Sequence, residues 1–155
     1  MKLSKIIDPE LLLTELNSEV TDDVLKEMTE FLKQKNKISD SKLILNKLIE
    51  RERLASTSIG KNTAIPHAKI KDLKNPIIMI AVCKKGFIYN PNDTEPVHLI
   101  ILVLSPSGAP ALQLQILAAA ASLIKKHGNL LEELLKAKSN VELAEKIKKF
   151  EELND

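Results

Sequence analysis

The sequence contains an almost unbroken apolar run, Val97-His98-Leu99-Ile100-Ile101-Leu102-Val103-Leu104. A second run, Ile77-Ile78-Met79-Ile80-Ala81-Val82-Cys83, begins directly after Pro76. Both runs have the length of a strand, and neither alternates apolar with polar residues. Strands with this pattern are buried on both faces. The two runs therefore predict the centre of a small β-sheet that is covered on both sides.

Segments with helical periodicity surround the two runs and supply the cover. Helices are expected to begin at Thr21, after Ser39 or Asp40, at Ala111, at Leu130 and after Ser139. Thr21 is the expected N-cap of the first helix, and Ser139 with Glu142 forms a capping box for the last. Short strands are expected at residues 11–13 and 63–65. This order predicts an α/β fold over residues 1–155: a single-domain three-layer sandwich with a small mixed β-sheet flanked by helices on both faces.

The composition excludes several classes of protein. A net charge of +2 and an aromatic content of 3% argue against binding to nucleic acid. Cys83 is the only cysteine, so an intrachain disulfide is impossible and a reducing compartment is favoured. The first residues form no apolar signal core, and no segment is long enough to span a membrane. We therefore expect a cytoplasmic protein that is not inserted into the membrane.

The residues with the clearest functional pattern lie in Ser56-Thr57-Ser58-Ile59-Gly60-Lys61-Asn62-Thr63-Ala64-Ile65-Pro66-His67-Ala68-Lys69. Pro66 fixes its own φ and favours an extended Ile65, and Gly60 permits backbone conformations that other residues resist. His67 is therefore expected at the end of a short extended segment, in a shaped loop. Its imidazole titrates near neutrality. From the spacing alone, a surface histidine without a function explains the pattern equally well.

The same region resembles a known family. Arg51-Glu52, Ser56-Thr57, Ile59-Gly60 and the run from Ala64 to Lys69 are similar, in order and spacing, to the active-site motif of the mannitol/fructose-type enzyme IIA domains of the bacterial phosphoenolpyruvate:sugar phosphotransferase system. The nitrogen-regulatory members share this motif. The resemblance extends from about Leu11 to Phe150. It implies a single α/β sandwich in which His67 is phosphorylated.

The resemblance also implies the partners and the residues that support the histidine. The donor would be an HPr-like phosphocarrier protein, and the acceptor an enzyme IIB component or a regulated target protein. Arg51 matches the active-site arginine of the family, and a guanidinium binds phosphate oxygens as a planar fork. From the spacing alone, a cation at a helix C-terminus is the more common interpretation of Arg51. Ser56 and Thr57 are candidate phosphoryl-binding residues, although loop hydroxyls more often bond their own backbone.

The sequence departs from the family at one position. Family members commonly carry a second histidine at the start of the helix after the second long strand, in a pattern like His-Leu-x-x-Leu. Here the stretch is Gln113-Leu114-Gln115-Ile116-Leu117, and the register points to Gln113, with Gln115 as the alternative. A glutamine donates a hydrogen bond but neither carries a positive charge nor relays a proton. Two functions therefore remain open: a phosphoryl carrier in sugar transport, and a nitrogen-regulatory-type module that is controlled by phosphorylation.

The remaining motifs indicate no cofactor. His98 lies within a predicted strand and His127 at the end of a predicted helix, so the three histidines and Cys83 show no metal-ligand spacing. The sequence contains neither a Gly-x-x-x-x-Gly-Lys loop nor a Gly-x-Gly-x-x-Gly motif. We therefore expect no bound metal, nucleotide or other cofactor.

Overall fold

Two long antiparallel strands form the centre of the sheet. The computed structural model describes residues 1–153, and in it β5 (Ile77–Phe87) pairs with β6 (Val97–Pro106). β1 (Leu12–Leu13) adds to β5 in parallel. On the other side of β6, β3 (Thr63–Ala64) and β4 (His67–Ile70) pair in parallel with successive parts of the same strand. β2 (Ser58–Gly60) pairs antiparallel with β3 and completes a mixed six-stranded sheet.

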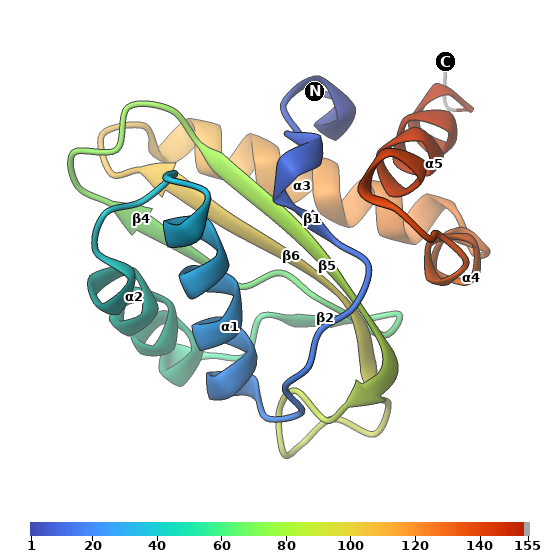
Figure 1. Cartoon of the computed structure of the whole chain (residues 1–155), viewed down its shortest axis with the longest axis horizontal. Helices are drawn as coiled ribbons and strands as arrows, with labels where there is room; N and C mark the ends of the chain where they lie inside the picture. Colours follow the sequence, from blue (N-terminus) through green and yellow to red (C-terminus); the bar gives the residue numbers. More distant parts are fainter. Residues whose placement is uncertain (154–155) are drawn as a thin grey trace.

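Helices lie on both faces of this sheet (Figure 1). One face is covered by α1 (Thr21–Gln34) and α2 (Ser41–Leu54). The other is covered by α3 (Pro110–Lys126), α4 (Leu130–Leu135) and α5 (Asn140–Glu152). Short 3₁₀ helices η1 (Leu3–Lys5) and η2 (Pro9–Leu11) precede β1. The predicted three-layer α/β sandwich is confirmed.

The central strand β6 divides the apolar core into two layers. Ile100, Leu102 and Leu104 belong to the cluster that packs with α1 and α2. Leu99, Ile101 and Val103 belong to the cluster that packs with α3, α4 and α5. Successive strand residues point to opposite faces, so an unbroken apolar run supplies both layers at once. This is why the predicted strands lack polar alternation.

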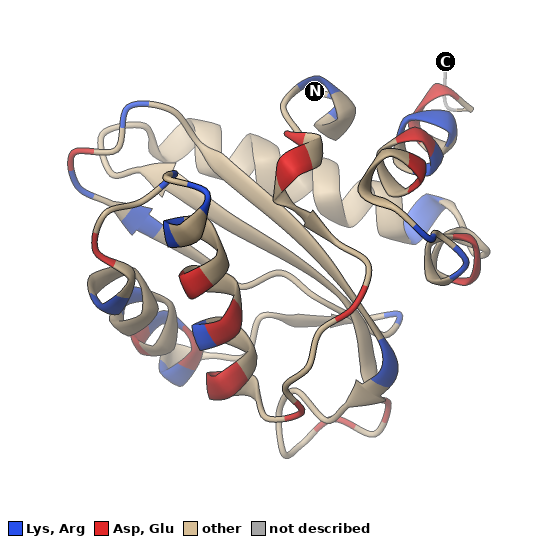
Figure 2. Cartoon of the chain, viewed as in Figure 1, with Lys and Arg blue, Asp and Glu red and all other residues tan. Residues whose placement is uncertain are grey.

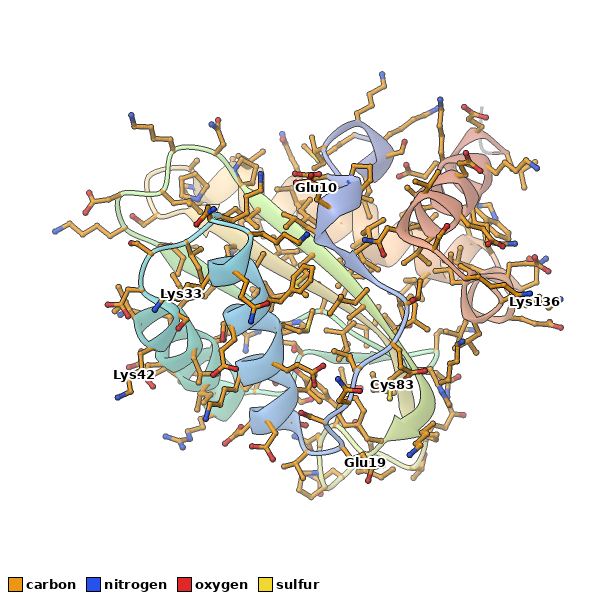
Figure 3. All side chains as sticks on the ribbon, in the orientation of Figure 1. Glu10, Glu19, Lys33, Lys42, Cys83 and Lys136 are labelled. Carbon is orange, nitrogen blue, oxygen red and sulfur yellow. The ribbon has the colours of Figure 1, made fainter. Side chains whose placement is uncertain are left out.

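Charged residues lie outside these layers. In Figure 2 the lysines, arginines and acidic residues lie mainly on helices and loops, with both signs mixed, whereas the long strands are largely free of charge. Figure 3 shows Lys33 and Lys42 on the outer sides of α1 and α2, while Cys83 lies in β5 and is buried. Burial raises the pKa of the Cys83 thiol, which therefore stays protonated. None of the helices in the described part of the chain combines the length and hydrophobicity needed to cross a membrane.

The helix caps follow the sequence prediction in two of three cases. Asp40 caps α2 by accepting the backbone N–H of Leu43 at 3.0 Å, and Ser139 caps α5 by accepting that of Glu142 at 3.1 Å. The prediction for Thr21 is wrong, because the N-cap of α1 is Val20. The Thr21 hydroxyl instead donates to the Tyr89 carbonyl at 2.6 Å. A bond to a distant loop has here replaced a local cap.

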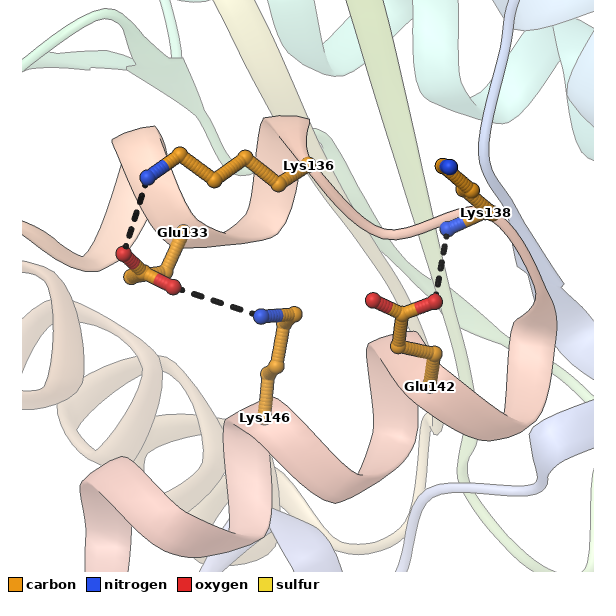
Figure 4. A network of polar contacts seen from close by, with 5 residues as sticks. All are labelled: Glu133, Lys136, Lys138, Glu142 and Lys146. Atoms are coloured by element: carbon orange, nitrogen blue, oxygen red, sulfur yellow. Dashed lines mark hydrogen bonds and ion pairs between the residues drawn. The ribbon is translucent and has the colours of Figure 1, made fainter.

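A small charge network joins the last two helices (Figure 4). Glu133 on α4 lies 3.3 Å from the ammonium groups of both Lys136 and Lys146, and Lys146 belongs to α5. The Glu142 carboxylate accepts the backbone N–H of Lys138 at 3.1 Å. Lys146 and Lys136 lower the pKa of the Glu133 carboxyl group. The groups are solvent-accessible, so these ion pairs contribute little to the stability of the fold.

Candidate functional site

His67 is the first residue of a strand. β3 ends at Ala64, the chain is interrupted at Ile65 and Pro66, and β4 begins at His67 opposite Val103 of β6. The Pro66 carbonyl still accepts the backbone N–H of Val103 at 2.9 Å, so the interrupted segment stays attached to the sheet. The expected strand before Pro66 is present, but the expected loop at His67 is wrong. The proline interrupts one edge of the sheet without releasing it, and pairing with β6 resumes at once.

The surroundings of the His67 ring determine which nitrogen carries the proton. Nδ1 lies 2.7 Å from the Ile65 carbonyl oxygen. Because a carbonyl oxygen only accepts hydrogen bonds, Nδ1 must be the donor and must carry hydrogen. In the neutral ring, Nε2 therefore holds the lone pair. The local chain path fixes the tautomer that a nucleophilic Nε2 requires.

The electrostatic surroundings favour the neutral ring. Burial is the main cause of a lowered pKa for His67. The bond to the Ile65 carbonyl raises this pKa, the positive charge of Arg51 lowers it, and the negative charge of Glu52 raises it. The net direction is downward from 6.5, so the imidazole is mostly neutral at pH 7.

Arg51 lies in the last turn of α2, and its charge acts on His67. Its Nη1 donates to the Ala55 carbonyl at 2.8 Å, which is the helix-end role that the alternative interpretation predicted. Among the described residues no carboxylate forms an ion pair with Arg51. The remaining N–H groups of its guanidinium are therefore available to an anion beside His67. Arg53, two residues further along the helix, is exposed.

Glu52 forms a partly buried hydrogen-bond network that the sequence did not predict. Its carboxylate accepts the Tyr89 hydroxyl at 2.6 Å, the Thr57 backbone N–H at 3.1 Å and the Thr57 hydroxyl. The Tyr89 and Thr57 oxygens lie 3.1 Å apart. Glu52 follows Arg51 in the motif, and this position alone could have marked it as a candidate site residue. Tyr89 comes from a loop with no periodicity, so nothing in the sequence placed it here.

The predicted phosphoryl-binding hydroxyls are already engaged. Thr57 is 5% exposed and bonds Glu52. The Ser56 hydroxyl accepts the backbone N–H of Ser58 at 3.2 Å, as loop hydroxyls commonly do. The Thr57 carbonyl accepts the backbone N–H of Ile65 at 3.0 Å, which fastens this segment to the chain before His67. A direct role of Ser56 or Thr57 in holding a phosphoryl group stays a prediction.

Gln113 lies in the first turns of α3 and is 7% exposed. His67 lies opposite Val103, near the C-terminal end of β6, which ends at Pro106. α3 begins at Pro110, so Gln113 and His67 lie toward the same end of this strand. No hydrogen bond joins Gln113 to His67 within residues 1–153. The charges of Arg51 and Glu52 therefore act on the His67 ring. Within residues 1–153, Gln113 forms no hydrogen bond to any of these three residues. Gln115 is exposed.

The other histidines lie outside this group. His98 lies in β6, as predicted, and its Nδ1 is 2.9 Å from the Cys83 carbonyl oxygen. His127 follows α3, and its ring packs against Phe150. In the described residues, no group of three or more His, Cys, Asp or Glu side chains is arranged to hold a metal ion.

Comparison with known proteins identifies the family to which the chain belongs. Residues 5–150 match the family described as "Phosphoenolpyruvate-dependent sugar phosphotransferase system, EIIA 2", and the chain belongs to this family. Among its relatives is the fructose-specific EIIABC component of Bacillus subtilis, 29% identical over 90% of this chain. The chain spans 22% of the length of that relative. The nitrogen regulatory protein of Bradyrhizobium diazoefficiens is 28% identical over 81% of each chain.

Solved structures share the fold. IIA-Ntr from Neisseria meningitidis has a TM-score of 0.83 and 21% identity, covering 94% of this chain and 98% of that one. The mannitol enzyme IIA of Escherichia coli, solved in complex with phosphorylated enzyme IIB, has a TM-score of 0.76 and 14% identity, covering 92% and 97%. The resemblance inferred from the motif around His67 is confirmed at the level of the family.

Proposed function

We propose that this chain is a cytoplasmic phosphoryl carrier of the sugar phosphotransferase system, with Nε2 of His67 as the acceptor atom. The observation that carries the proposal is the bond from Nδ1 to the Ile65 carbonyl. It fixes the proton on Nδ1 and leaves the lone pair on Nε2 of a ring that is neutral at pH 7. Membership of the family supports this assignment.

The transfer step needs little beyond these residues. The Nε2 lone pair forms a bond to phosphorus while the phosphorus–nitrogen bond of the donor phosphohistidine breaks and its electron pair returns to the donor ring. The Nδ1 proton of His67 stays in place. The His67 ring gains positive character on phosphorylation, which strengthens its bond to the Ile65 carbonyl. Arg51 is the cation that stabilises the phosphoryl oxygens, so positioning and charge supply most of the catalysis.

The proposed donor is an HPr-like phosphocarrier protein, and the proposed acceptor is an enzyme IIB component. The solved complex of a fold relative with phosphorylated enzyme IIB supports the second assignment. Leu54 and Leu114, at the C-terminal end of α2 and the start of α3, are 83% and 68% exposed. Such apolar residues suit small, transient contacts with two partners in turn.

A second candidate function is a nitrogen-regulatory-type module whose phosphorylation controls a target protein without sugar transport. Gln113 favours it, because an amide in place of the second histidine of the family cannot relay a proton. The similarity to nitrogen regulatory proteins supports it as well. The two functions share the acceptor His67 and differ in the protein that receives the phosphoryl group.

Incubation with phosphoenolpyruvate, enzyme I and HPr, followed by intact mass measurement, tests the proposal. We expect one acid-labile phosphoryl group on the wild-type chain, none on His67→Ala, and one on the control His98→Gln. A His67→Ala chain that still gains the label would refute the assignment. Adding a IIB protein to the labelled chain then separates the two functions, since only the sugar-transport carrier passes its label on.

A further inference from the structure

We propose that Glu52 is a positioning residue whose negative charge, held beside His67 by Tyr89 and Thr57, keeps the phosphoryl group transferable. This inference rests on the proposed phosphoryl chemistry at His67. A carrier must release the group it accepts, so binding it too tightly is as harmful as binding it too weakly. Nothing in the sequence analysis assigned a role to Glu52 or Tyr89.

The position of the carboxylate is fixed from two sides. Tyr89 and Thr57 donate to it, as described above, and both are only 5% exposed. Tyr89 is itself anchored, because its carbonyl accepts the Thr21 hydroxyl of α1 at 2.6 Å and its ring contacts Phe87. Burial and the nearby Glu52 raise the pKa of the Tyr89 phenol, so it remains a hydrogen donor. Glu52 therefore has one defined place and is not a freely moving surface carboxylate.

The charge of Glu52 opposes that of Arg51 at the imidazole. Arg51 attracts a phosphoryl dianion on His67, whereas Glu52 repels it. The same pair acts in opposite directions on the protonation of the ring. Because the Nδ1 proton is kept, phosphorylation adds a net charge of −1 to the neutral ring, as protonation adds +1, so the Glu52 carboxylate opposes phosphorylation about as strongly as it favours protonation. Removing the charge should make phosphorylation of His67 more favourable and release slower.

The test compares Glu52→Gln with two controls. Tyr89→Phe keeps the charge and loses the hydrogen bond from the Tyr89 hydroxyl to the carboxylate. Glu151→Gln is the matched control for a buried carboxylate: Glu151 is 6% exposed, accepts the backbone N–H groups of Leu3 and Ser4 at 2.6 and 2.7 Å, and lies in α5. Each chain is mixed with phosphorylated HPr, and the ratio of phosphorylated chain to phosphorylated HPr is measured at equilibrium. The imidazole pKa of His67 is measured separately by NMR without any donor.

For Glu52→Gln we expect the equilibrium to shift toward the phosphorylated chain by about threefold, and the pKa of His67 to fall by about half a unit. Tyr89→Phe should give less than half of either change, and Glu151→Gln neither change. An equilibrium that is unaltered in Glu52→Gln would overturn the proposal. So would an equal shift in Tyr89→Phe, because the effect would then come from lost structure and not from lost charge.

The two proposals fail in different ways. If the wild-type chain gains no phosphoryl group from HPr, the proposed function fails and this inference fails with it. If the wild type is phosphorylated and Glu52→Gln shows the wild-type equilibrium, only the role of Glu52 is lost. The NMR measurement reports whether the Glu52 charge reaches His67 in either case.

Discussion

At the scale of single residues, the two nitrogens of His67 have different tasks. Nδ1 is bonded to the Ile65 carbonyl, and Nε2 is the proposed nucleophile. Protonation of Nε2 removes its lone pair, so the phosphorylation rate should fall as the pH drops through the pKa of His67. Burial lowers this pKa below 6.5, so we expect the rate to reach half of its maximum at a pH below 6.5. Single-turnover rates from pH 5 to 8 measure it, and a midpoint above pH 7 would contradict the account.

The same lowered pKa predicts how stability depends on pH. The unfolded chain binds a proton at His67 near pH 6.5, whereas the folded chain binds it only at lower pH. The contribution of His67 to the free energy of unfolding is therefore complete above pH 6.5 and is lost as the pH falls toward the folded pKa. Urea unfolding of wild type and His67→Gln should show this loss in the wild type alone. A His67→Gln chain that loses as much stability over this range would point to other groups.

Arg51 is the second residue whose chemistry can be tested alone. Lysine keeps a positive charge but lacks the planar pair of donors that binds two phosphate oxygens together. We expect Arg51→Lys to lower the single-turnover phosphorylation rate about 10-fold and Arg51→Ala about 100-fold or more. Arg53→Ala, two residues along the same helix and exposed, is the control. Equal rates for Arg51→Ala and Arg53→Ala would leave Arg51 with its helix-end role only.

At the scale of elements, α2 carries both Arg51 and Glu52 and is held at its start by Asp40. Removing an N-cap carboxylate leaves backbone N–H groups without a partner and costs about 1 kcal/mol. Asp40→Ala should lower the free energy of unfolding in urea by this amount. Asp22→Ala in the first turn of α1, where the side chain makes no cap bond, should cost less than half as much. Equal losses would show that the helix dipole, and not the cap, explains the effect of Asp40.

The elements that the sequence predicted well are those with a strong local pattern. β5 and β6 follow from unbroken apolar runs, and the helices from periodicity and caps. The strand β4 was missed, because residues 67–70 include His67 and Lys69 and follow a proline. Its pairing with β6 is a long-range contact that no local pattern announces. That pairing places His67 opposite Val103 at the sheet edge.

At the scale of the whole molecule, the start and the end of the described chain are bonded together. The Glu151 carboxylate accepts the backbone N–H groups of Leu3 and Ser4. Glu151→Ala leaves these buried donors without a partner, so we expect a loss of about 1–3 kcal/mol in the free energy of unfolding. Glu152→Ala, exposed and next in sequence, is the control. A Glu151→Ala chain as stable as the control would mean that water replaces the carboxylate without cost.

Some features of the candidate site follow from local sequence patterns, and others depend on contacts between residues that are distant in the sequence. His67 and Arg51 were found because their motif is contiguous or closely spaced. The network of Glu52 was not, since Tyr89 reaches it from 37 residues away. The tautomer of His67 was also hidden, because it depends on where the chain path places the Ile65 carbonyl. The sequence thus predicted His67 as the reacting residue, while the protonation of its ring and its surrounding charges required the folded chain.

The most direct test of the central claim is NMR of the chain labelled with ¹⁵N at histidine, before and after phosphorylation by HPr. The account predicts that free His67 is the Nδ1–H tautomer at pH 7 and that the phosphoryl group then appears on Nε2 of His67, with His98 and His127 unchanged. A phosphoryl group on Nδ1 of His67, or on another histidine, would contradict it.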